Sequence, residues 1–135
     1  MPHAVSGNRG SSRALATVCG IVSTMDVDGE YVQISTATPS REVADAIALA
    51  LVERRLAACV QVVGPVHSTY RWQGNVESAE EWICLIKTAR PLYDAVERTI
   101  RELHPYDTPE IIAMPIVAGD AAYLRWVSEQ IDVEP

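Results

Sequence analysis

The spacing of apolar and polar residues predicts a strand followed by a helix in the first patterned part of the chain. Residues 30–38 are rich in β-branched side chains and have no helical period, which is typical of a strand. Thr38 and Pro39 then predict a helix start, because threonine can cap a helix and proline fits its first turn. Apolar residues recur every three to four positions over residues 43–52, which predicts an amphipathic helix that ends near Leu56.

The middle of the chain has the pattern of a long β-hairpin. Residues 58–66 form an extended run broken by Gly64-Pro65, and residues 66–73 alternate between two faces. Gly74-Asn75 is a hairpin turn signal, after which residues 76–88 return. Because the far end of this hairpin is polar, we expect it to project beyond a compact body. A projecting hairpin cannot bury both faces within one small domain, so the pattern predicts a symmetric homo-oligomer.

The last third of the chain repeats the order of helix and strand. Pro91 opens a helix whose apolar stripe runs over residues 92–103, and residues 111–117 predict a strand. Gly119-Asp120 predicts the end of that strand and the cap of a final helix with an apolar stripe over residues 123–131. The predicted order is β-α-β-β-α-β with a C-terminal helix. This is an α+β fold of the ferredoxin-like type, with a long hairpin between its second and third strands.

The bend at residues 104–110 (HPYDTPE) is the most informative stretch of the chain. Pro105 and Pro109 each fix their own φ and disfavour the helical region for the residue before them, so the preceding helix must end near His104. The bend holds an imidazole, a phenol and two carboxylates, and loops on a rigid scaffold often carry function. A stiff connection from helix to strand is also common, however, and the residues alone favour this plainer interpretation.

Composition limits the classes of protein to consider. The 135 residues suffice for one domain, and we interpret residues 1–28 as a flexible leader before a domain at residues 29–135. A net charge of −7 and a pI near 4.8 argue against nucleic acid or an anionic membrane as a partner. Cys19, Cys59 and Cys84 are widely spaced without a C-x-x-C motif, which indicates a reducing compartment and a cytoplasmic protein.

The residues give several weak chemical signals and no motif of a catalytic nucleophile, so we predict that the chain is not an enzyme. No paired spacing of cysteine and histidine suggests structural zinc, although a site could assemble in space. Cys59 and Cys84 are more simply small buried residues on strands. The acidic cluster at residues 77–81 is interpreted as a solvated face. Tyr70, Trp72 and Lys87 could line a pocket against Tyr106, or the aromatic residues could cover the sheet or a subunit interface.

Several ordered segments give the chain a resemblance to a known family. These are residues 55–60 (RLAACV), 70–74 (YRWQG), 86–88 (IKT), 102–111 (ELHPYDTPEI), 119–120 (GD) and 123–126 (YLRW). Together they make the chain resemble the CutA divalent-cation tolerance family. The resemblance implies a ferredoxin-like subunit in a homotrimer, with the hairpin pairing between subunits, and cytoplasmic tolerance of divalent cations, copper foremost. It implies neither a catalytic reaction nor a tightly bound cofactor.

The resemblance also suggests two alternative sets of site residues. Some relatives carry a cysteine in the first strand where this chain has Ser35, so the predicted copper ligands are Cys59 and His104, with His67 as a weaker addition. The trimeric ferredoxin-like shape is similar to that of the PII signalling proteins. The alternative function is therefore a module that binds a small anion or metabolite between subunits. The residues predicted to line that inter-subunit cleft are Trp72, Lys87, Tyr106 and Glu110, together with His104.

Overall fold

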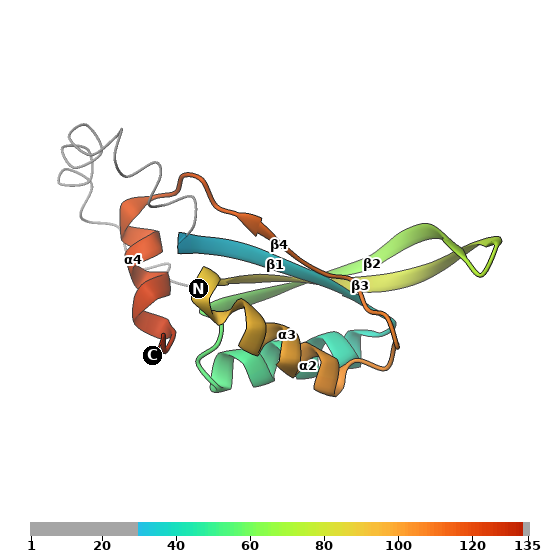
Figure 1. Ribbon diagram of the computed structural model, residues 1–135, viewed down its shortest axis with the longest axis horizontal. Helices are drawn as coiled ribbons and strands as arrows, with labels where there is room; N and C mark the ends of the chain where they lie inside the picture. Colours follow the sequence, from blue (N-terminus) through green and yellow to red (C-terminus); the bar gives the residue numbers. More distant parts are fainter. Residues whose placement is uncertain (1–29, 134–135) are drawn as a thin grey trace.

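The computed structural model describes residues 30–133. Four antiparallel strands form one sheet in the order β2-β3-β1-β4, and helices α2 and α3 lie together on one face of it (Figure 1). The elements are β1 (Tyr31–Thr38), α2 (Arg41–Glu53), β2 (Cys59–Trp72), β3 (Asn75–Ala89), the short helix η1 (Arg90–Leu92), α3 (Tyr93–Leu103), β4 (Ile111–Pro115) and α4 (Ala121–Gln130). The predicted α+β, ferredoxin-like order with a C-terminal helix is confirmed.

Alternate residues of the central strands face the helices and form the core. In the register of β1 and β3, Ile34 lies opposite Ile86 and Thr36 opposite Cys84, and all four side chains are fully buried. The helices and the residue after α4 add further buried side chains: Ala44, Ile47, Leu51, Val96, Ile100, Val127 and Ile131. Burial of each large aliphatic side chain contributes about 2 kcal/mol. The stripes predicted from periodicity therefore supply most of the core.

The other face of the sheet carries the remaining alternate positions, and we call it the open sheet face. Its residues are Gln33, Ser35, Val63, Ile83, Leu85, Lys87, Ile112 and Met114. Since α2 and α3 lie on the opposite side, large apolar side chains of this face stay in contact with solvent: Val63 is 47% exposed, Ile112 47% and Met114 48%. The fold thus leaves an apolar sheet surface that its own helices do not cover.

Two predicted helix boundaries were wrong. The N-cap of α2 is Ser40, whose side chain accepts a hydrogen bond from the Val43 backbone N–H at 3.2 Å. Thr38 instead ends β1, where its hydroxyl lies within 3.0 Å of the Trp82 carbonyl oxygen of the neighbouring strand. At the other end α2 stops at Glu53 rather than near Leu56, because the positive φ of Arg55 turns the chain out of the helix.

The strand boundaries also differ slightly from the prediction. The hairpin turn is formed by Gln73 and Gly74, both with positive φ, and Asn75 already belongs to β3. Positive φ at two adjacent residues matches the right-handed twist of the strands, and it uses the glycine one position later in the turn than predicted. β4 ends at Pro115 rather than at residue 117, because its partner β1 begins at Tyr31 and no ladder extends beyond that residue within the described part of the chain.

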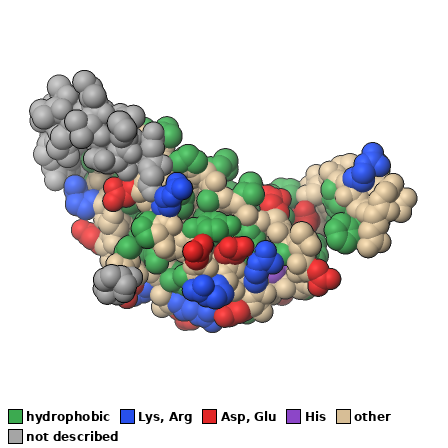
Figure 2. All heavy atoms as spheres, in the orientation of Figure 1, with side chains coloured by type: hydrophobic (Ala, Val, Ile, Leu, Met, Phe, Trp, Pro, Cys, Tyr) green, Lys and Arg blue, Asp and Glu red, His purple; other side chains and the backbone are tan. Residues whose placement is uncertain are grey.

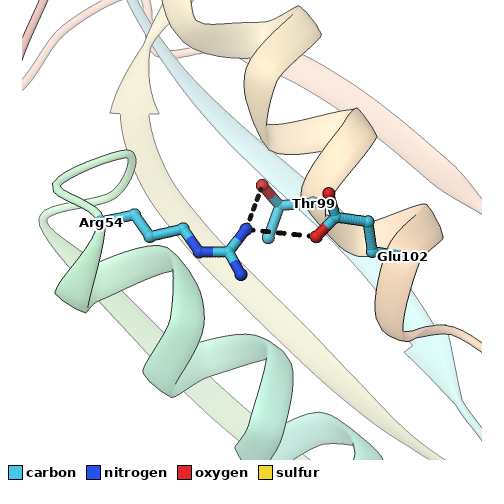
Figure 3. A network of polar contacts seen from close by, with 3 residues as sticks. All are labelled: Arg54, Thr99 and Glu102. Carbon is cyan, nitrogen blue, oxygen red and sulfur yellow. Dashed lines mark hydrogen bonds and ion pairs between the residues drawn. The ribbon is translucent and has the colours of Figure 1, made fainter.

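A small polar network joins the ends of α2 and α3. The Arg54 guanidinium donates to the Glu102 carboxylate at 3.2 Å and to the Thr99 hydroxyl at 3.4 Å (Figure 3). The Arg54 and Glu102 side chains are about half exposed, so this ion pair adds less than about 1 kcal/mol. Its geometric effect is to hold the end of α3 beside α2. This contact lies one residue before Leu103, after which the bend begins.

The hairpin extends well past the end of β1, as predicted (Figure 1). From Val66 to Glu81 its strands pair only with each other, after a register shift between Val63 and Val66. Figure 2 shows this part as an arm beside the body, with basic and hydrophobic side chains near its end. The proposed leader at residues 1–28 lies outside the described residues. Within residues 30–133, none of the helices has the length and apolar composition of a membrane span.

Candidate functional site

The ring of His104 ties the bend to the end of β1. α3 ends at Leu103, and His104 takes an extended conformation while its backbone N–H still donates to the Ile100 carbonyl. Its Nε2 lies 2.8 Å from the Ala37 carbonyl oxygen, and its Nδ1 accepts from the Tyr106 backbone N–H at 3.2 Å. These partners require a proton on Nε2 and a lone pair on Nδ1. The imidazole is 8% exposed, so both of its nitrogens are committed inside the protein.

Tyr106 connects the bend to the base of the hairpin arm. Its hydroxyl donates to Oε2 of Glu81 at 3.2 Å, and its ring packs against His104 with a centroid separation of 4.8 Å. Partial burial raises the pKa of Tyr106, and the nearby Glu81 carboxylate raises it further through its charge and its hydrogen bond. The phenol therefore stays protonated and remains a donor to the carboxylate at neutral pH.

Glu81 is a site residue that the sequence interpretation missed. Glu77 and Glu80 are exposed, as a solvated acidic face requires, but Glu81 of the same cluster is only 9% exposed. The prediction of a solvated face was therefore wrong at this position. The signal was present in the alternation of β3, because Glu81 continues the series of Ile83 and Leu85 on one side of the strand.

A hollow of about 770 Å³ lies between the hairpin arm and the bend. Three of the four residues predicted for a ligand cleft line it, namely Trp72, Tyr106 and Glu110. Tyr70, Glu77 and Glu81 of the hairpin also contribute, as does Asp107 of the bend. Because the bend is held by His104 and by the Tyr106–Glu81 hydrogen bond, the two walls of the hollow are fixed relative to each other.

The fourth predicted cleft residue, Lys87, lies elsewhere. It stands opposite both Gln33 and Cys59 in the sheet, and its Nζ donates to Oε1 of Gln61 at 3.0 Å. Six residues of extended β3 separate it from Glu81, which corresponds to roughly 20 Å. Lys87 is thus part of the open sheet face and does not line the hollow of its own chain.

The three predicted metal ligands occupy separate places. Cys59 begins β2 near Tyr123 of α4, where burial raises the pKa of that tyrosine and the electrostatic influence of Cys59 adds to it. His67 is exposed on the hairpin arm opposite Glu80, roughly 25 Å further along β2. His104 is buried in the bend. Within residues 30–133 no three His, Cys, Asp or Glu side chains are grouped so that they could hold a metal ion.

Cys84 fits the plainer interpretation of a small buried residue. Its side chain is fully buried between the sheet and α2, where the Sγ–H points to the Ala44 carbonyl at 3.6 Å. Burial, with a smaller contribution from Asp45, raises the pKa of this thiol from 9.0 to about 11. A thiol that stays protonated at neutral pH is neither a nucleophile nor a ready metal ligand.

Comparison with known proteins places this fold and this bend in one family. The family model described as "CutA1 divalent ion tolerance protein" matches residues 32–130, so this chain belongs to that family. The divalent-cation tolerance protein CutA of Thermus thermophilus is 48% identical over 91 residues, which cover 67% of this chain and 88% of that protein. Mouse protein CutA is 42% identical over 91 residues, and the match covers 67% of this chain but only about half (51%) of the mouse protein.

Solved structures agree with this assignment. The Thermus thermophilus Cut A1 structure is 43% identical and superposes with a TM-score of 0.74, covering 76% of this chain and 99% of that one. CutA1 from Oryza sativa is 31% identical with a TM-score of 0.76, covering 80% of this chain and 99% of the rice chain. The names of the relatives state different cellular compartments. An Arabidopsis thaliana relative is described as chloroplastic and an Archaeoglobus fulgidus structure as periplasmic.

Proposed function

We propose that this chain acts in divalent-cation tolerance as a non-catalytic homotrimer of the cytoplasm that binds copper or another divalent cation. Membership of the CutA1 family supports the tolerance role. The observation that carries the trimer is the open sheet face, where Val63, Ile112 and Met114 are each about half exposed. Copies of the same chain can cover this face symmetrically, and the hairpin arm gives each copy a strand pair that can reach a neighbour.

Two features of the described residues support the non-catalytic and cytoplasmic parts of the proposal. Cys84 is a buried, protonated thiol, and the bend uses its imidazole as a structural brace rather than as a base beside a nucleophile. Cys84 is a free thiol, as expected in a reducing compartment.

Copper binding by the predicted residues has a defined structural requirement. Because no three suitable donors gather in residues 30–133 of one chain, a site with Cys59 or His67 needs donors from outside this part of the chain, which a neighbouring copy can supply. His104 can ligate a metal only if it gives up its hydrogen bond to Ala37 or to Tyr106. The proposal therefore ties metal binding to the assembled trimer, with Cys59 as the first candidate ligand.

Native mass spectrometry of the reduced protein, with copper and a competing chelator, tests both parts of the proposal. We expect a trimer that takes up copper in a multiple of three ions, and a Cys59→Ser variant that forms the trimer but loses the copper. Met114→Glu places a charge on the open sheet face and should dissociate the trimer. Leu49→Glu is the matched control, because Leu49 is 59% exposed on α2 away from that face. A monomeric wild-type protein would refute the assembly, and a trimer without copper would refute direct metal binding.

The second candidate is a small-ligand module, and the hollow beside the bend is the observation that favours it. Its walls include Trp72, Tyr106 and Glu110, which the alternative function predicted. The acidic lining of the hollow within one chain disfavours a small anion as the ligand. The acidic lining of the hollow instead favours a positively charged ligand.

A further inference from the structure

We infer that the hollow between the hairpin arm and the bend is a binding site for a small organic cation. Four carboxylate residues line it, namely Glu77, Glu81, Asp107 and Glu110, whereas Arg71 is the one basic residue of its lining among the described residues. The potential in such a concave acidic site attracts positive ligands. This inference stands on the described residues of one chain and does not depend on copper binding.

The strongest indication is that Glu81 is buried without an ion-pair partner among residues 30–133. This carboxylate is 9% exposed, and its Oε2 accepts one hydrogen bond from Tyr106. The two ion pairs found among residues 30–133 join Arg54 to Glu102 and Arg101 to Glu97, so neither provides a counter-charge for Glu81. Burial of a carboxylate beside a neutral phenol leaves its negative charge uncompensated, and a bound cation would compensate it.

The hairpin arm presents Glu81 and its neighbours on one face. In the register of β2 and β3, Glu81 lies opposite Val66 and Glu77 opposite Tyr70, and the strand period puts these four residues on the same side of the arm. Trp72 follows two residues after Tyr70 on that side. Two carboxylates and two aromatic side chains from the arm thus face the hollow, and the bend closes it with Tyr106.

The aromatic residues indicate what kind of cation fits. Tyr70, Trp72 and Tyr106 line the hollow and are 40%, 49% and 39% exposed, so their rings are accessible to a ligand there. The faces of such rings attract cations with diffuse charge, such as methylated ammonium or guanidinium groups. Aromatic walls beside a buried carboxylate combine the two interactions that hold an organic cation.

A metal ion is a poorer match for the same hollow. A divalent cation needs several oxygen ligands within about 2.5 Å of one point. The carboxylates of the hollow do not form such a group, since no three His, Cys, Asp or Glu side chains of residues 30–133 are placed to hold a metal. A volume of about 770 Å³ is instead within the usual range of small-molecule sites.

Titration of the full-length protein with tetramethylammonium chloride tests the inference directly. The indole N–H signal of Trp72 in a proton–nitrogen NMR spectrum serves as the probe, and sodium chloride keeps the ionic strength constant. We expect saturable shifts of the Trp72 signal. Tert-butanol, a neutral molecule of similar shape, should produce no saturable shift. Equal responses to both compounds, or no saturable shift with the cation, would overturn the proposal.

Two variants locate the binding to this hollow. Glu81→Gln keeps the shape of the side chain and an acceptor for Tyr106 but removes the charge, so binding should weaken about tenfold or more. Glu80→Gln is the matched control, because it changes the net charge equally at an exposed neighbouring position and should bind as the wild type does. Tyr70→Leu changes a side chain that is 40% exposed, keeps the Trp72 probe and should weaken binding as well, with Trp126 as the reporter of intact folding.

The binding measured for the variants decides whether the hollow holds a free cation or is filled by a neighbouring copy of the chain. If Glu81→Gln and Tyr70→Leu bind tetramethylammonium as tightly as the wild type, the site lies elsewhere and the proposal is wrong. If the trimer forms and shows no binding while the Met114→Glu protein binds, a neighbouring copy fills the hollow and the proposal of a site for a free ligand is wrong. Loss of copper binding alone leaves the expected shifts unchanged, so this test and the test of metal tolerance fail separately.

Discussion

At the scale of single residues, the bend depends on one imidazole with two hydrogen bonds. His104 receives the Tyr106 N–H and donates to the Ala37 carbonyl, so one ring joins the start of the bend, its third residue and the end of β1. A sequence pattern can indicate that such a histidine is unusual, but ligand and brace look alike in the sequence. The contacts show a brace.

His104→Ala is predicted to lower the free energy of unfolding by about 2–3 kcal/mol, because it leaves the buried Ala37 carbonyl and the Tyr106 N–H without partners. Urea denaturation followed by circular dichroism measures the change. His67→Ala is the control, because His67 is exposed and should change stability by less than about 0.5 kcal/mol. Equal denaturation midpoints for the two variants would contradict the structural role of His104.

Cys84 makes stability depend on pH in the alkaline range. The pKa of the thiol is near 9.0 in the unfolded chain and about 11 in the folded protein, where burial disfavours the thiolate. Between these values the unfolded state releases a proton that the folded state keeps, so stability falls as the pH rises above 9. The thiol is expected to contribute a loss of about 2 kcal/mol between pH 9 and pH 11.

Unfolding curves at a series of alkaline pH values test this effect. Cys84→Ala removes the titrating group, so the variant should be less stable at pH 7 but should lose less stability between pH 9 and pH 11 than the wild type. Parallel pH profiles for the two proteins would show that Cys84 does not titrate as proposed.

Glu81 and Lys87 show what sequence reasoning could and could not reach at this scale. Trp72, Tyr106 and Glu110, which the sequence analysis grouped in an inter-subunit cleft, line one hollow of the single chain. Glu81 could have been included from the alternation of β3. The position of Lys87 could not be predicted in the same way, because it depends on how far the hairpin arm extends past β1.

At the scale of elements, the geometry of β2 at its register shift requires a glycine. A Cβ atom added at Gly64 would lie 2.4 Å from Cδ1 of Trp82, which is far inside van der Waals contact. Trp82 packs partly buried against the core, so it cannot simply move away. This contact explains why the extended run is interrupted by a glycine at that position and yet continues as one strand.

Gly64→Ala is predicted to destabilise the fold by about 1–3 kcal/mol, since the new methyl group overpacks the indole. In a Trp82→Leu background the same substitution should cost much less. Chemical denaturation of the four proteins of this double-mutant cycle measures the coupling. An equal cost in both backgrounds would show that the indole is not the obstacle.

The elements themselves were well predicted, while their boundaries were less so. Hydrophobic periodicity identified the strands and helices because burial of one face determines both periods. The N-cap was predicted two residues too early, since Thr38 is a good cap by type but is held in the β1–β3 ladder by its hydrogen bond to Trp82. That interaction joins two strands that are 44 residues apart in the sequence, so local sequence cannot reveal it.

At the scale of the whole molecule, the body and the hairpin arm have separate roles. The core lies between the sheet and α2 and α3, whereas residues 68–79 contribute no buried side chain. The sequence predicted this division because the hairpin is long and its far end is polar. The sequence also predicted the arm, but the assembly that would use it is still a proposal.

Replacement of residues 68–79 by Asn-Gly is predicted to leave the body folded. His67 and Glu80 are paired across the hairpin, so a two-residue turn can join them. The free energy of unfolding should change by less than about 1 kcal/mol, while self-association should weaken. Thermal unfolding and light scattering on a sizing column measure the two effects. A shortened protein that no longer unfolds cooperatively would show that the arm is part of the folding unit.

The separation between body and arm also has a consequence for the way sequences in this family can change. A substitution in the arm beyond Ser68 hardly affects folding, so selection acts on it only through what the arm contacts. Mutations in the body are instead selected against mainly because they lower the stability of the fold. When the arms of many relatives are compared, their residues should vary freely unless a ligand or a neighbouring subunit holds them. Positions of the arm that do not vary would therefore be constrained by binding to a ligand or a subunit, and not by the stability of the fold.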